Sequence, residues 1–248
     1  MTSPAESLPE PQVVMTHETT VPAYHIFNPN NWDGLSRSIV ASCAAQFGLL
    51  QYAASCVPQV VSDCDDLCYA RFSDLQEQWA RSPWELRRGT YWVEVPEFHL
   101  YTQAYLSTVK TLLDLLAQLV TTEELVNKKV HGFHKKGQEC GGQLLHILNT
   151  KALPTKGKVA SHLCGLIEEH KRIWIDRAID LRDTLIHLEK GLSQIMFALD
   201  VEVDRENLRL AGILHPQIGG QGLEEYAEQT TQHISRFCTE FLDGLKAS

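Results

Sequence analysis

Long apolar runs are missing from this 248-residue sequence, although 44% of its residues are hydrophobic. The longest wholly apolar stretches are only a few residues, whereas about 20 are needed to cross a bilayer. We therefore expect no membrane-spanning segment. The first residues, Met1–Glu6, also lack the basic start and apolar core of a secretory signal. The sequence thus predicts a cytoplasmic protein without a membrane partner.

A disulfide framework and a complete set of metal ligands are missing as well. The seven cysteines are odd in number and scattered along the chain, which is typical of free, buried thiols. Cys64 and Cys68 could offer two ligands on one helix, with His131 and His134 as distant partners. No second cysteine pair or His-x3-His arrangement completes a tetrahedral site. We expect no metal and no cofactor.

Positive charge is scarce, because the formal net charge is -9, and this argues against a protein that coats nucleic acid indiscriminately. Seven of the eleven lysines nevertheless lie between Lys128 and Lys158, with Glu139 as the one acid there. This segment carries a charge of +6 and the remainder carries -15. It is either a phosphate-attracting surface or a solvated loop. Its candidate RNA-binding residues are Lys128, Lys129, His131, His134, Lys135 and Lys136, with Phe133 available to stack on a base.

Helical periodicity dominates what is present. Apolar residues recur three or four apart in four long segments, near 35–55, 97–126, 159–190 and 222–245, and shorter helices are predicted over 65–81 and around 144–148. Pro58 is expected to end the first helix. Two short runs, Tyr91–Val95 and Phe197–Asp204, resemble strands. Each long helix has one apolar stripe to hide, so the predicted fold class is an all-α helical bundle with a small β-hairpin or short-strand decoration.

The domain organisation follows from the prolines. Five of the ten lie in the first 29 residues, among Ser, Glu, Thr and Asn. Residues 1–31 are therefore predicted to form an irregular N-terminal arm outside the core. Residues 32–248 are predicted to form a single helical domain, which is long enough to bury a substantial core.

The most informative motif lies on the predicted helix 159–190, where Arg182, Asp183 and His187 flank the apolar stripe. A neutral histidine can remove the proton of an RNA 2′-hydroxyl, while an arginine stabilises charge on the phosphoryl oxygens. Asp183 precedes His187 by four residues and could orient its imidazole. Such cleavage needs no metal. A five-residue step turns a helix by roughly 140°, so Arg182 and His187 converge only through a kink or a second subunit.

At these residues the sequence resembles the HEPN superfamily of all-α proteins, whose ribonuclease members carry an arginine, usually a polar residue after it, and a histidine four to six residues later. The matching residues are Arg182, Asp183 and His187, and the resemblance covers about residues 97–245. It implies a homodimer whose two motifs face each other across a cleft, and a metal-independent endoribonuclease. It also implies a role in toxin-antitoxin or other defence systems, with a possible antitoxin or regulatory protein as partner. His187 is followed by Leu188-Glu189, which departs from the His-x-Tyr extension of some HEPN toxins.

The same residues also fit a chain without catalysis. Arg182 could extend into solvent or pair with an acid of another helix, because its neighbours three and four residues away offer no acid. Asp183 and His187 could form a surface pair. The alternative is therefore a non-catalytic HEPN-like helical interaction or regulatory protein.

Overall fold

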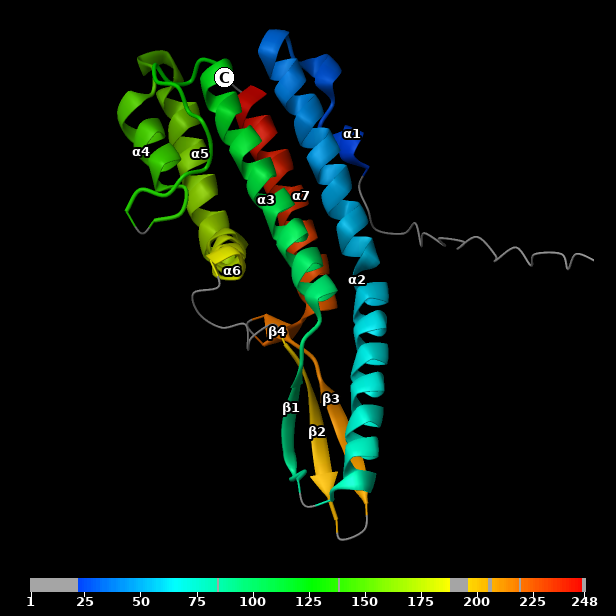
Figure 1. The fold of residues 1–248 in the computed structure, drawn as a ribbon. Helices are drawn as coiled ribbons and strands as arrows, with labels where there is room; N and C mark the ends of the chain where they lie inside the picture. Colours follow the sequence, from blue (N-terminus) through cyan, green and yellow to red (C-terminus); the bar gives the residue numbers. More distant parts are fainter. Residues whose placement is uncertain are drawn as a thin grey trace, which may run out of the picture.

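The chain is mostly α-helical, with a small three-stranded antiparallel sheet beside the C-terminal half of its longest helix (Figure 1) and a separate pair of two-residue strands. The computed structural model describes residues 22–83, 85–137, 139–187, 196–204, 207–218 and 220–246. The helices are α1 (Ala23–Ile26), α2 (Gly34–Arg81), α3 (Pro96–Thr122), α4 (Gly142–Lys151), α5 (Gly157–His170), α6 (Asp176–His187) and α7 (Leu223–Lys246). The strands are β1 (Gly89–Val93), β2 (Phe197–Val203), β3 (Leu208–Leu214), β4 (Gln217–Ile218) and β5 (Gln221–Gly222). The prediction of a mostly helical chain with short strands is confirmed.

A single helix, α2, replaces the two helices predicted over 35–55 and 65–81. The prediction that Pro58 ends a helix was wrong, because Pro58 lies inside α2. A proline inside a helix removes one backbone hydrogen bond and costs about 3 kcal/mol. The buried stripe of α2 continues on both sides of the proline, with Phe47 and Leu50 before it and Cys64 and Leu75 after it. Burial of this stripe against other elements offsets the local cost.

The core lies where α3 and α7 pack between α2 on one side and α5 with α6 on the other (Figure 1). Its largest fully buried side chains include Phe47, Leu106, Leu112, Phe237 and Phe241. Burying one such side chain contributes about 1.5–3 kcal/mol. This shared core, rather than helix propensity alone, holds the helices side by side.

Part of the predicted irregular arm belongs to this core. Residues 23–26 form α1, residues 29–31 form a 3-10 turn, and Phe27 between them is fully buried. The ring of Phe27 lies 5.7 Å from that of Phe47. The core thus begins before residue 32, while residues 1–21 lie outside the described chain.

The sheet has the strand order β1-β2-β3, and all its pairs are antiparallel. Both predicted strand-like runs are confirmed as strands, and β2 forms a hairpin with β3, a strand that the residue pattern did not predict. Strand β1 adds to β2 from a point more than 100 residues earlier, with Val93 opposite Phe197. The residues Phe197, Leu199 and Val201 alternate along β2 and are buried.

Helix α2 also contains the one segment of the described chain that is long and apolar enough to cross a membrane. Only 28% of its apolar window is buried inside the molecule. Length and composition alone fit a core helix as well as a membrane span, so the expectation of no membrane segment stays a prediction.

Helices α5 and α7 meet at a buried histidine. His170 is fully buried, and its Nδ1 accepts a hydrogen bond from Trp174 Nε1 at 2.9 Å. The ring hydrogen therefore lies on Nε2, which is 3.4 Å from Glu240 Oε2. Burial lowers the pKa of His170 below its usual value, and the nearby Glu240 carboxylate only partly opposes this shift.

We expect this histidine to make the protein less stable as the pH falls from 7.5 to 5.5. The unfolded chain takes up a proton near pH 6.5 and the folded chain only at lower pH, so stability declines by up to about 1.4 kcal/mol per pH unit for each such histidine. Burial also lowers the pKa of His233, which acts in the same direction. Thermal unfolding across this range measures the slope. His170→Gln should reduce the slope, whereas the same change at the exposed His146 should not; equal slopes in both variants would contradict the assignment.

Candidate functional site on helix α6

The motif predicted over 182–187 lies in a continuous helical segment that is described over residues 157–187. This segment consists of α5, a π-helical turn at Lys171–Ile175, and α6. The predicted apolar stripe is buried at Leu163, Ile167, His170, Trp174, Ala178 and Leu185. Residues 188–190 of the predicted helix lie outside the described chain. A single π turn inside an α-helix is frequent at functional sites.

Arg182 is paired with its neighbour in sequence. Its NH1 donates to Asp183 Oδ1 at 2.9 Å, and the Arg182 side chain is 27% exposed. The expectation that any acid for Arg182 must come from elsewhere was therefore wrong. The Nε of Arg182 is buried and has no hydrogen-bond partner within the described residues. The guanidinium is thus held at one nitrogen and keeps donors for another acceptor.

Asp183 is shared between two cations. Its Oδ2 accepts a hydrogen bond from Lys135 Nζ at 2.6 Å, while Oδ1 accepts from Arg182. Lys135 Nζ also lies 4.0 Å from Asp180 Oδ1, one turn earlier on α6. Partial burial acts to raise the pKa of Asp183, but the hydrogen bonds from Lys135 and Arg182 outweigh it and lower that pKa. The hydrogen bond to Asp183 raises the pKa of Lys135. The carboxylate therefore stays ionised and bridges the two cations.

The loop that carries Lys135 is anchored to α3. Asp114 Oδ1 accepts from the backbone N–H of Phe133 at 2.5 Å, Gln118 donates to the carbonyl of His131 at 3.1 Å, and Thr121 accepts from Val130 at 2.8 Å. These three anchors lie three and four residues apart on α3, on one face of that helix. The loop that carries Lys135 is thus fixed to one face of α3.

The expectation that Phe133 is available to stack on an RNA base was wrong, because its side chain is only 2% exposed. Its ring packs over Gly141, where an added Cβ would lie 2.3 Å from the ring. Gly141 also has a φ of 66°, a backbone conformation that favours glycine. Phe133 is part of the core that fixes the loop.

A second lysine fastens the same loop to the π turn. Lys171 is buried, and its Nζ donates to the carbonyl of Cys140 and to Asp176 Oδ1, the latter at 3.1 Å. Glu139 Oε1 lies 3.9 Å from the same Nζ. The loop is therefore joined to the segment 157–187 at Lys171 and again at Lys135.

Lys135 is the one predicted RNA-binding residue for which a contact with Arg182 or Asp183 is observed in the described chain. His131, His134 and Lys136 lie in the same loop and are exposed. Lys128 and Lys129 are exposed near the end of α4, where Asn127 N–H donates to the carbonyl of Lys151 at 3.2 Å. His187 is the last residue of α6, and its side chain lies outside the described residues.

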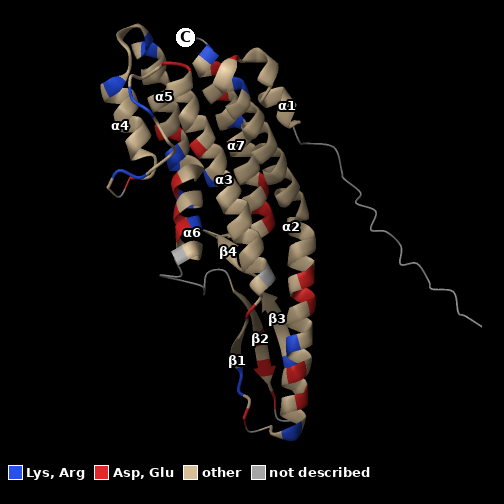
Figure 2. Cartoon of the chain, turned by 45° about the horizontal axis from the view of Figure 1, so that its top comes forward, with Lys and Arg blue, Asp and Glu red and all other residues tan. Residues whose placement is uncertain are grey.

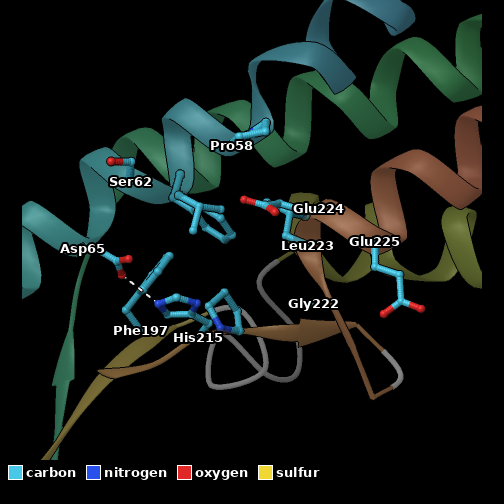
Figure 3. Close-up of a pocket in the computed structure, with 12 residues that line it drawn as sticks. Pro58, Ser62, Asp65, Phe197, His215, Gly222, Leu223, Glu224 and Glu225 are labelled. Atoms are coloured by element: carbon cyan, nitrogen blue, oxygen red, sulfur yellow. Dashed lines mark hydrogen bonds and ion pairs between the residues drawn. The ribbon is translucent and has the colours of Figure 1, made fainter. Parts of the chain in front are cut away.

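Sequence reasoning missed a histidine–aspartate pair in another part of the molecule. His215 Nε2 lies 2.7 Å from Asp65 Oδ1, beside an open hollow of about 500 Å³ between α2, the sheet and the start of α7 (Figure 3). The two residues are 150 positions apart, so no spacing signal could have paired them. Ser62 lines the same hollow but points away from His215, and no Ser–His–Asp triad forms (Figure 3).

Other chemistry finds less support. The described residues form two further pockets of about 520 Å³ each. One is lined by Trp32 and Glu123, and the other lies between α2 and α7. Neither these pockets nor the one beside His215 is lined by Arg182, Asp183 or Lys135. Within the described ranges, no group of three or more His, Cys, Asp or Glu residues is arranged to hold a metal ion. All seven cysteines are free. The pair of Arg182 and Asp183 lies outside these three pockets, and it is the candidate site because it carries the predicted motif.

Comparison with known proteins yields no assignment. No protein-family model matches the chain, and no curated protein or solved structure matches it.

Proposed function

We propose that this chain is a HEPN-like, metal-independent endoribonuclease of a defence or stress system, in which the packed helices form a HEPN-type bundle. The observation that supports the proposal best is the arrangement of Arg182. Its guanidinium is held at one nitrogen by Asp183, and Lys135 offsets the charge of that carboxylate. His187 follows on the same helix five residues later. A cation with free donors can stabilise phosphoryl oxygens, and a histidine on the same helix can supply the base for phosphodiester cleavage.

In the proposed reaction, His187 removes the proton from a 2′-hydroxyl. The 2′-oxygen then forms a bond to the adjacent phosphorus, and the bond from phosphorus to the 5′-oxygen breaks. The leaving 5′-oxygen takes a proton from water, so the products are a 2′,3′-cyclic phosphate and a 5′-hydroxyl. Arg182 stabilises the charge on the non-bridging oxygens. Asp183, expected to orient His187, is occupied by Arg182 and Lys135, and its role is to position the guanidinium.

Binding of the RNA backbone falls to the exposed basic residues of the loop. Lys128, Lys129, His131, His134 and Lys136 supply donors and positive charge there, and Lys135 supports the site through Asp183. The resemblance also implies a homodimer in which two copies of the motif face each other, and an antitoxin or regulatory protein as a further partner. The proposed location is the cytoplasm, from the N-terminal sequence. A second copy would overcome the divergence of Arg182 and His187 along one helix.

One observation favours a non-catalytic interaction protein as the second candidate. Asp183 pairs with both Arg182 and Lys135, and ion pairs of this kind also occur as structural support without a catalytic role. In that case α6 would form part of a partner interface.

The test is cleavage of a mixed pool of single-stranded RNA and tRNA in the presence of EDTA, with identification of the product ends. The proposal predicts cyclic-phosphate ends, and cleavage that weakens as salt is added because fewer backbone contacts survive. Folded protein that leaves the pool intact would contradict the ribonuclease proposal and support the interaction protein.

A further inference from the structure

One face of the molecule exposes apolar side chains and carries no charge. Residues 38–62 of α2 contain no lysine, arginine, aspartate or glutamate. Figure 2 shows this part of α2 in tan, while the charged residues of the helix gather towards its C-terminal half. The adjoining start of α3, residues 98–109, is also without these four residue types. We name this surface the α2–α3 face.

The side chains on the α2–α3 face are largely solvent-exposed. Eight exposed residues of α2 lie on one side of the helix, because most of them are three or four positions apart: Ser38, Ala41, Ser42, Ala45, Leu49, Tyr52, Ser55 and Gln59. The two large ones, Leu49 and Tyr52, are 55% and 64% exposed, and Leu100 of α3 is 67% exposed. Burial raises the pKa of Tyr101 of α3, and the nearby Cys56 and Tyr52 of α2 raise it further, so these side chains lie close together and join the two helices into one surface.

The absence of charge indicates which partner fits this face. Two copies of a chain with a formal net charge of -9 repel each other, and the repulsion is weakest where both present uncharged side chains. A different protein would find no charged group here to select it. In a two-fold contact the same patch of both copies is buried, so the apolar and hydroxyl side chains of one copy contact the apolar and hydroxyl side chains of the other. Homodimer interfaces are also more apolar than other protein surfaces.

The size of the face fits a reversible dimer. A stretch of 25 helical residues is about 36 Å long, and packed helices lie about 8–10 Å apart. With the shorter stretch of α3, each copy would bury on the order of 500 Å², so both together would bury on the order of 1,000 Å². This value lies at the lower limit for specific protein interfaces and is typical of contacts that dissociate on dilution.

We propose that the α2–α3 face is a self-association surface on which a second copy of this chain docks. Helix α2 lies across α3 and α7 from α6 (Figures 1 and 2). The contact is therefore distinct from any contact between two α6 helices, and it does not rest on the proposed ribonuclease activity.

The test combines mass measurement by light scattering with labelling of Cys56 by a maleimide. Cys56 is the one cysteine that is not buried, so the reagent reports on this face. For the wild type we expect the mass to halve, and labelling of Cys56 to accelerate, on dilution from about 100 µM to about 1 µM. Tyr52→Glu should weaken association at least about 100-fold, since each dimer would bury two unpaired carboxylates. Tyr69→Glu changes an equally large side chain, 55% exposed, in the charged half of the same helix and should leave association unchanged.

Circular dichroism should show equal helix content in all three proteins, because both tyrosines are exposed. A wild-type mass and a labelling rate that do not change on dilution would overturn the proposal. Equal masses for wild type and Tyr52→Glu would overturn it as well. Wild-type protein whose mass does not change on dilution but that floats with neutral phosphatidylcholine vesicles would assign the face to lipid instead.

Discussion

Replacing Arg182 by alanine should lower the rate of RNA cleavage by about 10²–10³-fold, the usual cost of removing one donor that stabilises a developing oxyanion. The loss should fall on kcat and kcat/KM alike, because the guanidinium acts on charge that develops in the transition state. Arg182→Lys should recover little of the rate, since a lysine cannot offer the planar set of donors. Single-turnover cleavage of one labelled RNA measures each rate.

The fold should survive these changes, since Asp183 keeps its hydrogen bond to Lys135. Arg172→Ala is the matched control, because Arg172 is an exposed arginine on the same helical segment whose Nε donates to the carbonyl of Glu168. His187→Ala should lower the rate by about 10²–10⁴-fold, as expected for a general base. Wild-type rates in the Arg182 and His187 variants would show that the cleavage arises elsewhere.

Lys171→Met should lower the free energy of unfolding by about 2–3 kcal/mol, a large effect for one side chain. The substitution keeps most of the side-chain volume but removes the donor to the Cys140 carbonyl and to Asp176. Asp176 and Glu139 are partly exposed and can regain water, so the loss stays below that of a fully buried ion pair. Unfolding in urea, followed by circular dichroism, measures the change.

The neighbouring Arg172→Met should change the free energy of unfolding by less than about 0.5 kcal/mol, as is usual for surface positions. Hydrogen exchange should also accelerate in the loop around Cys140 in Lys171→Met and not in the control. Equal stabilities for the two variants would show that Lys171 does not fasten the loop.

The helical stripes could be predicted because their information is local. The buried positions Leu163, Ile167 and Trp174 follow directly from helical spacing. The same local rule misplaced a helix end at Pro58, because burial of residues on both sides of the proline outweighs one lost hydrogen bond. The pairing of β1 with β2 depends on chain segments that are far apart, and no periodic pattern encodes it.

The residues of the site could be predicted from the sequence, but the contacts among them could not. Adjacent residues on a helix do not usually face each other. The usual spacing of three or four residues between paired side chains therefore did not predict the pair of Arg182 and Asp183. Lys135 reaches Asp183 from 48 positions away, through a loop whose path depends on Asp114 and the buried ring of Phe133. The path of this loop results from packing between distant residues, so the spacing of residues in the sequence does not predict it.

The π turn at Lys171–Ile175 determines the direction in which the side chains of the following helix, α6, point. A π turn holds one residue more than an α turn, and one residue corresponds to about 100° of rotation around the helix axis. The π turn, which ends seven residues before Arg182, therefore determines on which side of the helix the Arg182 side chain lies. An insertion or deletion between α5 and α6 would turn the guanidinium away from Lys135 without altering a single residue of the motif.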